Sequence, residues 1–176
     1  ADEKGKLSFK ILQDGYFNEK YIRQIFIDNK NRMWLATNDG LAMADVNQEE
    51  ITDSSFVKFR LDNGMLPTSE IMCITIIHDG TIWLGTQSLG VLVCRYEKNG
   101  KLTYRQISTE QGLVNNNVRS ILEDANGNVW VTTEEGMSRI DIEKNAIKNY
   151  RPSNEFMGNV FSEDCATMMD DGRLLL

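Results

Sequence analysis

The stretch GTIWLGTQSLGVLVCRY, residues 80–96, decides the fold because the chain contains two further copies of it in altered form. These copies are NRMWLATNDGLAMADV, residues 31–46, and GNVWVTTEEGMSRIDI, residues 127–142. Their tryptophans, Trp34, Trp83 and Trp130, follow one another at intervals of roughly 45 to 50 residues, and Leu175 takes the tryptophan position of a partial fourth copy. One tryptophan in a repeat of about this length is typical of the four-stranded blade of a β-propeller.

Each copy extends into four short strands separated by turn residues. The first strands are predicted at 21–28, 70–78 and 117–124; the second strands carry the tryptophans; the third strands are predicted at 41–46, 91–96 and 137–142, and the fourth at 56–61, 102–107 and 147–151. We therefore predict an all-β chain of antiparallel blades at about 21–61, 70–107 and 117–151, with a partial final blade at 160–176 and a strand of a preceding blade at 7–12.

The predicted strands are apolar on both faces, as residues 71–77 (IMCITII) illustrate. A sheet packed between two others has this pattern, and the tryptophans are expected to fill the space between blades. A closed ring of about seven blades needs roughly 330 residues, so the chain supplies about three and a half blades of such a ring.

Composition limits the partners of the chain. It has 176 residues, of which 41% are hydrophobic, and a formal net charge of −7 without a cluster of lysine and arginine, which argues against nucleic acid. No apolar run reaches the roughly 18 to 20 residues of a membrane-spanning helix. Because the chain starts without Met and ends in an apolar run, we expect it to be a piece of a longer protein. Cys73, Cys94 and Cys165 lack metal-type spacing and are predicted to be buried free thiols.

Few residues suggest chemistry. The one histidine, His78, lies beside a turn, which favours an exposed turn residue over a nucleophilic centre. Residues 124–128 begin like a calcium loop, but no late bidentate glutamate follows, so a hairpin turn is favoured. The adjacent acids at 134–135 and 170–171 suit an acid/base pair, although acids in turns are usually solvated. No catalytic residue, metal or cofactor is therefore predicted.

Each copy carries a form of the core pattern (Asn/Asp)-Gly-x-(Ile/Val)-Trp-(Leu/Val)-x-Thr, and the connectors NGMLP, residues 63–67, and QGLVN, residues 111–115, stand before first strands, so that the match extends over nearly the whole chain. In these features the sequence resembles the two-component regulator propeller repeat of bacterial hybrid two-component systems. The resemblance implies a sensor region in the periplasm, followed in the longer protein by a membrane segment and a histidine kinase. Residues 154–176 depart from the pattern and are similar to the closing blade of such a propeller.

Propeller geometry directs the search for a ligand to one rim, where the loops before each first strand and between the second and third strands meet. Arg23 and Arg119 occupy equivalent positions there, where they can bind a carboxylate or sulfate of an acidic sugar or form salt bridges with loop acids. Asparagine-rich loops beside Tyr21 also suit neutral sugars. The predicted rim residues are Tyr21, Arg23, Asn38, Asp39, Glu70, Gln87, Asn116, Arg119 and Glu134.

These expectations describe a non-catalytic extracytoplasmic sensor segment, for which the resemblance implies a glycan-derived oligosaccharide as ligand. Two alternatives remain open: a propeller enzyme, such as a polysaccharide lyase or a glycoside hydrolase, and a scaffold propeller that binds proteins. Blade faces left open at the ends predict self-association of the chain. Membrane contact is expected only through other parts of the longer protein.

Overall fold

The computed structural model describes residues 15–151, 161–162, 166–169 and 173–175. The predicted strand at 7–12, the thiol of Cys165 and the acid pair at 170–171 lie outside these residues. Among the described residues, no helix is long and apolar enough to cross a membrane.

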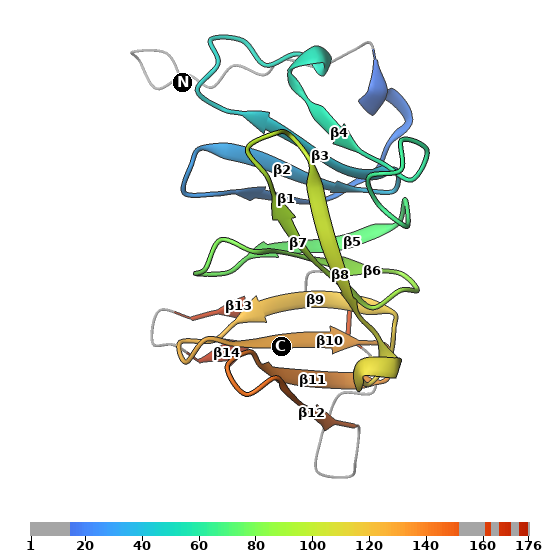
Figure 1. Ribbon diagram of the computed structural model, residues 1–176, viewed down its shortest axis with the longest axis vertical. Helices are drawn as coiled ribbons and strands as arrows, with labels where there is room; N and C mark the ends of the chain where they lie inside the picture. Colours follow the sequence, from blue (N-terminus) through green and yellow to red (C-terminus); the bar gives the residue numbers. More distant parts are fainter. Residues whose placement is uncertain (1–14, 152–160, 163–165, 170–172, 176) are drawn as a thin grey trace.

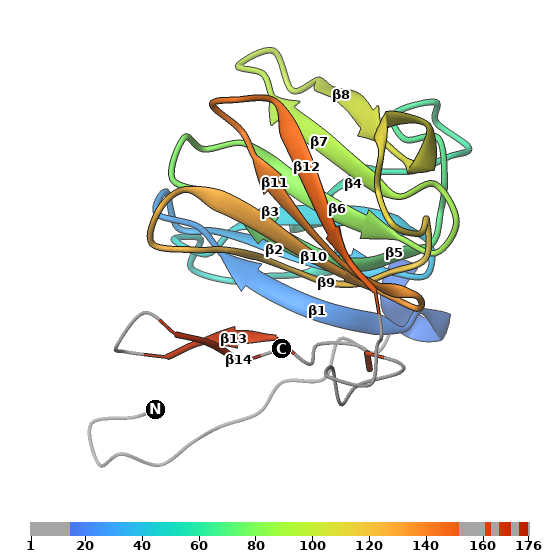
Figure 2. The same ribbon diagram turned by 90° about the horizontal axis from the view of Figure 1, so that it is seen from below.

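Three four-stranded antiparallel sheets follow one another along the chain and are stacked along its long axis (Figures 1 and 2). The first strand of each sheet contacts the first strand of the next. The first sheet contains β1 (Ile22–Ile27), β2 (Arg32–Thr37), β3 (Gly40–Asp45) and β4 (Val57–Phe59); the second contains β5 (Ile71–Ile76), β6 (Ile82–Thr86), β7 (Val91–Tyr96) and β8 (Leu102–Ile107); the third contains β9 (Val118–Glu123), β10 (Asn128–Thr133), β11 (Gly136–Asp141) and β12 (Ala146–Tyr150).

The predicted all-β class with four-stranded antiparallel blades is confirmed, and we call the three sheets blades 1, 2 and 3. Their strands lie within the expected ranges of 21–61, 70–107 and 117–151. Two further strands, β13 (Thr167–Met168) and β14 (Leu174–Leu175), pair with each other inside the range expected for a partial blade. Short 3-10 helices at Tyr16–Glu19, Asp53–Ser55 and Thr109–Gln111 lie in the connections.

Apolar side chains from adjacent blades interlock. Trp34 of blade 1 is fully buried in a cluster with Leu84 and Leu92 of blade 2, and Trp83 of blade 2 is buried with Val118 and Val131 of blade 3. Each of these tryptophans thus packs toward the following blade, which confirms the predicted packing role for Trp34 and Trp83.

The third tryptophan has a different environment. Trp130 is only partly buried, and its ring stacks on Tyr150 of the same blade, with ring centroids 5.6 Å apart. The stacking covers one side of the indole at the end of the blade stack.

Two of the cysteines can be placed. Cys73 and Cys94 are buried free thiols in the two clusters between blades, as predicted. Burial raises the pKa of the Cys94 thiol to about 12, so it remains protonated and unreactive at neutral pH.

Candidate ligand-binding rim

Backbone hydrogen bonds hold the predicted rim together. The turn between the second and third strands of each blade donates to the residue at the start of the first strand: Asn38 N to Tyr21 O (3.2 Å), Gln87 N to Glu70 O (3.3 Å) and Glu134 N to Asn117 O (3.2 Å). The same turns reach the next blade, because Gly40 N donates to Ser69 O (2.7 Å) and Gly90 N to Asn116 O (2.9 Å). The rim residues therefore form a continuous edge across three blades.

The two rim arginines are engaged in ion pairs. Arg23 Nη2 lies 2.8 Å from Glu70 Oε2, which links blade 1 to blade 2, and Arg119 Nη2 pairs with Glu134 of its own blade. Of the two alternatives for these arginines, salt bridges to loop acids are present in the structure. A ligand anion at either arginine has to compete with the paired carboxylate.

Hydrogen-bonding capacity remains at the rim. The buried Nε of Arg23 and Oδ1 of Asn117 have no hydrogen-bond partner among the described residues. The Gln87 side chain is exposed and makes no hydrogen bond within the described part of the chain, and Tyr21 is 74% exposed. The Gln87 amide and the Tyr21 hydroxyl are therefore available to hydroxyl or carboxylate oxygens of a ligand.

The remaining rim residues support loops. Asn38 Oδ1 accepts from Tyr21 N (2.9 Å), and Asn116 Oδ1 accepts from Thr109 N (2.8 Å). Asp39 lies 3.2 Å from Lys20 Nζ and 3.3 Å from Arg60 Nε. These three side chains are committed to local structure, so they shape the rim more than they offer free binding groups.

Sequence reasoning missed Tyr16. Its hydroxyl donates to Asp39 O (2.6 Å), and the nitrogen of Lys58 lies 4.7 Å from the centre of its ring. Burial is the largest cause that raises the pKa of Tyr16, which stays neutral as a donor. The stretch DGYFN, residues 14–18, looks like a degenerate copy of the connectors, and the tyrosine in it was the available signal.

Asp124, in the stretch that begins like a calcium loop, holds a turn and a tryptophan. Asp124 accepts from Asn126 N and Asn128 N (both 2.9 Å) and from Trp130 Nε1 (2.8 Å), which matches the favoured hairpin turn. Burial alone would raise the pKa of Asp124, but the hydrogen bonds from Trp130 and Asn128 outweigh it and lower the pKa. No group of His, Cys, Asp and Glu suited to a metal occurs among the described residues.

His78 is 71% exposed, as expected for a turn residue, yet it contacts the next blade. Its ring Nδ1 pairs with Glu123 of blade 3, and its backbone N donates to Glu123 Oε2 (2.8 Å). The hydrogen bond and charge of Glu123 raise the pKa of His78.

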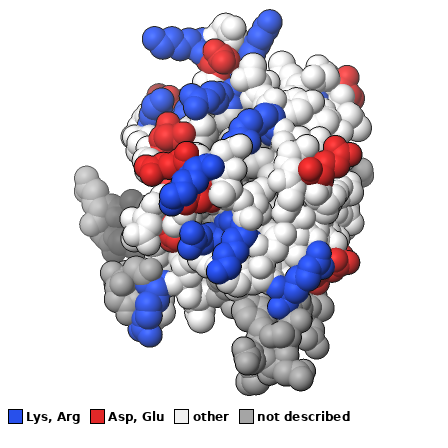
Figure 3. Space-filling model, turned by 60° about the horizontal axis from the view of Figure 1, so that its bottom comes forward, with Lys and Arg blue, Asp and Glu red and all other residues white. Residues whose placement is uncertain are grey.

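Basic and acidic side chains are interspersed on the face shown in Figure 3, where no broad surface of one sign appears.

Known proteins share this architecture. The family model for the two-component regulator propeller matches residues 15–39 and 112–135. Two separate segments of the chain thus match the two-component regulator propeller repeat. The matched segments contain the first strands of blades 1 and 3 and the rim residues at both ends of the edge.

Among curated proteins, the chain is 26% identical over 147 residues to "Histidine kinase P4" of Formosa agariphila, and the match covers 81% of this chain and 10% of the kinase. Two extracellular domains assigned to hybrid two-component systems of B. thetaiotaomicron have similar structures. One has 19% identity and a TM-score of 0.55 and covers 99% of this chain and 28% of the domain. The other has 20% identity and a TM-score of 0.67, and the match covers 87% of this chain and 21% of that domain.

Virginiamycin B lyase of Staphylococcus aureus also has this fold, with 18% identity, a TM-score of 0.62 and coverage of 89% of this chain and 48% of the lyase. At these identities the solved structures establish the propeller architecture. The regulator propeller repeats are a more specific relation, because the family match involves the sequence of the repeat itself.

Proposed function

We propose that this chain is part of the extracytoplasmic sensor region of a two-component signalling protein. The observation that carries the proposal is the match of the regulator propeller repeat at two separate blades, 15–39 and 112–135. The similarity to a histidine kinase, over a tenth of its length, and to extracellular domains of hybrid two-component systems supports the same assignment. In such a protein the chain contributes ligand binding outside the cell, and the kinase lies elsewhere.

The proposed ligand is a glycan-derived oligosaccharide bound at the rim. Gln87 and Tyr21 present exposed hydrogen-bonding groups, while the ion pair of Arg23 and Glu70 offers both a donor fork and an acceptor. Sugars are recognised by such planar polar side chains together with aromatic rings. A ligand that bridges Tyr21 and Gln87 contacts blades 1 and 2 together, so binding favours one arrangement of these blades.

Glycan-array binding tests this proposal. We expect the chain to bind a restricted class of oligosaccharides and to lose binding with Gln87→Ala, a substitution that removes no internal hydrogen bond of the described residues. Chromatography of the incubated glycans separates the enzyme alternative, because a sensor returns them intact. Cleaved glycans would contradict the proposal and favour a lyase or hydrolase; absence of binding across the array would contradict the sugar ligand.

A further inference from the structure

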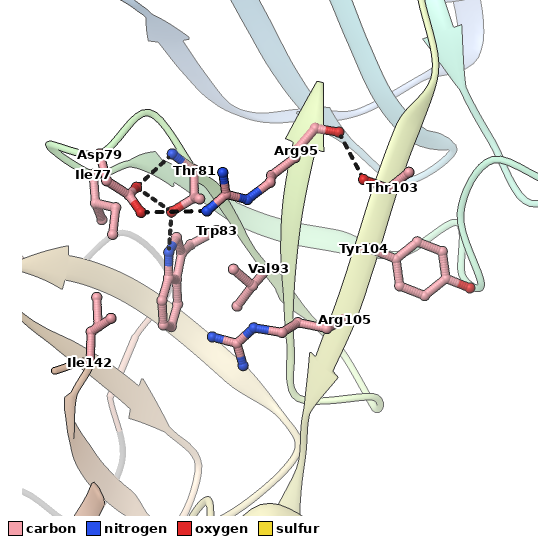
Figure 4. Close-up of a pocket in the computed structure, with 10 residues that line it drawn as sticks. All are labelled: Ile77, Asp79, Thr81, Trp83, Val93, Arg95, Thr103, Tyr104, Arg105 and Ile142. Atoms are coloured by element: carbon pink, nitrogen blue, oxygen red, sulfur yellow. Dashed lines mark hydrogen bonds and ion pairs between the residues drawn. The ribbon is translucent and has the colours of Figure 1, made fainter. Parts of the chain in front are cut away.

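A cavity of about 290 Å³ lies between blades 2 and 3, at the edge opposite to the rim (Figure 4). Its walls come from the turn between β5 and β6, from β6, β7 and β8 of blade 2, and from Ile142 of blade 3. The buried side chains of Ile77, Trp83 and Val93 form an apolar floor. A second cavity, of about 380 Å³, shares Arg105 and Ile142 with the first, so Arg105 lies between the two.

The internal repeat explains why this space is open. At the equivalent place between blades 1 and 2, the guanidinium of Arg32 lies 5.2 Å from the centre of the Trp34 ring and 5.4 Å from that of Tyr96. Asp28 fixes it, with Oδ2 accepting from Arg32 Nε (2.7 Å). Arg32 thus fills the first interface with a stacked, paired side chain.

At the interface between blades 2 and 3, the arginine, the aspartate and the tyrosine are all replaced. Thr81 stands two residues before its tryptophan, where blade 1 has Arg32, and Ile77 stands where blade 1 has Asp28. Ile142 takes the position that Tyr96 has in blade 2, six residues after the glycine of the turn. Because these three side chains are smaller or uncharged, they do not fill the space, and a cavity remains beside Trp83.

Two arginines face this cavity. Arg105 pairs across the sheet with Val93, where blade 1 has Val57, and it makes no ion pair or hydrogen bond with the described residues. Arg95 lies 4.0 Å from Asp79, whose Oδ1 already accepts from Thr81 N (2.8 Å). In Figure 4 both guanidinium groups are on the cavity side, whereas Tyr104 points away.

We propose that this cavity binds a small ring-bearing molecule through a carboxylate or sulfate group. The oxyanion pairs with Arg105 and Arg95, whose forked donors match its planar or tetrahedral oxygens, and the ring packs on Val93 and Ile142. Asp79 contributes one carboxylate to the lining and Arg95 and Arg105 contribute two guanidinium groups, so the charge of the cavity favours an anion. The site is separate from the rim and stands whether or not the rim binds a sugar.

Tryptophan indole signals provide the test, because the chain has three tryptophans and one of them lines the cavity. In proton–nitrogen correlation spectra, glucuronate is expected to shift the Trp83 indole signal with a Kd on the order of 1 mM, and the Trp34 signal much less. Glucose, which has the ring without the carboxylate, and acetate, which has the carboxylate without the ring, are expected to bind at least about tenfold more weakly. Equal binding of glucose and glucuronate would overturn the proposal, as would equal shifts at all three indoles.

Variants sharpen the test. Arg105→Gln is expected to weaken glucuronate binding at least about tenfold, while Lys101→Gln, an equal charge change on the same blade outside the cavity, leaves it unchanged. Thr81→Arg places in the second interface the side chain that fills the first, and it should abolish binding. The unshifted Trp34 and Trp130 signals report that each variant is folded. Wild-type affinity in either cavity variant, or equal loss in Lys101→Gln, would refute the site.

Discussion

The carboxylate of Asp28 connects a turn, a tryptophan and an arginine. It accepts from Lys30 N (2.9 Å), from Arg32 Nε (2.7 Å) and from the indole of the fully buried Trp34 (3.0 Å). Burial alone would raise the pKa of Asp28, but the hydrogen bonds from Trp34 and Arg32 outweigh it and lower the pKa. The charge is therefore retained at neutral pH inside the first interface between blades.

Removal of this carboxylate should be costly. Asp28→Ala leaves the indole N–H and the guanidinium without their acceptor, and we expect the free energy of unfolding to fall by about 2 to 4 kcal/mol. Urea denaturation measures the change, with the exposed Asp45→Ala as a control that should cost less than about 1 kcal/mol. Equal losses for the two variants would contradict the role of Asp28.

His78 gives the stability of the chain a pH dependence. Its pKa is raised in the folded state by the hydrogen bond and charge of Glu123, so its contribution is complete below the unfolded value of about 6.5 and is lost as pH rises through the folded value. We predict that wild type exceeds His78→Gln in thermal midpoint at pH 5.5 by more than at pH 8.5. An equal difference at both pH values would show that the ion pair with Glu123 contributes nothing.

At the scale of the strands, the glycine that opens or directly precedes each third strand is tightly constrained. Gly90 has φ of 76°, and a Cβ on it would lie 2.3 Å from the carbonyl oxygen of Ile107, at the end of the fourth strand. Gly40 and Gly136 show the same close approach, to Phe59 and Tyr150. The repeat keeps glycine here because both the backbone conformation and the space exclude a side chain.

The substitutions Gly90→Ala and Gly100→Ala separate the effect of the backbone conformation from the effect of the steric contact. Gly100 also has positive φ, 81°, but nothing lies within 4 Å of its Cβ position. We expect Gly100→Ala to cost about 1 kcal/mol from conformation alone, and Gly90→Ala to cost at least about 2 kcal/mol more, because β8 has to move. Denaturation midpoints in urea give both values, and similar costs would mean that the blade tolerates the displaced strand.

The strands were predictable because their residues repeat: the tryptophan, threonine and glycine of each copy fix the second and third strands and the turn between them. The ion pairs of the rim side chains were less predictable from the sequence. The equivalence of Arg23 and Arg119 was visible in the sequence, but Arg23 pairs with the next blade and Arg119 with its own. Which acid each arginine reaches depends on the offset between blades, which the repeat does not encode. The cavity beside Trp83 likewise depends on residues from two copies at once.

At the scale of the whole molecule, the two ends of the blade stack differ. The outer face of blade 1 exposes Ile25 and Ile27, which are 57% and 58% accessible, beside a cavity of about 630 Å³ lined by Phe17, Met33 and Leu35. The corresponding face of blade 2 is covered by the tryptophan-bearing face of blade 1. We propose that the Trp130 face of a second copy covers the outer face of blade 1, in a head-to-tail arrangement.

Sedimentation velocity tests this association. Ile25→Lys with Ile27→Lys should convert a concentration-dependent assembly into a monomer, because two charges enter an apolar contact. Tyr104→Lys, at an exposed aromatic residue of blade 2, should leave the assembly unchanged. A wild-type chain that sediments as a monomer at all concentrations would contradict the proposal.

The central claim is that the rim of these regulator propeller repeats binds the oligosaccharide signal of a sensor. Its most direct test is thermal unfolding of the proposed sensor region that contains this chain, measured against oligosaccharides from many glycans, with Gln87→Ala as the matched variant. A ligand held by the folded state at a hundred times its Kd adds about 2.7 kcal/mol, so we predict that one glycan class raises the midpoint by about 2 °C or more and that the variant loses this rise. A midpoint that no glycan raises, or a rise that survives Gln87→Ala unchanged, would contradict the claim.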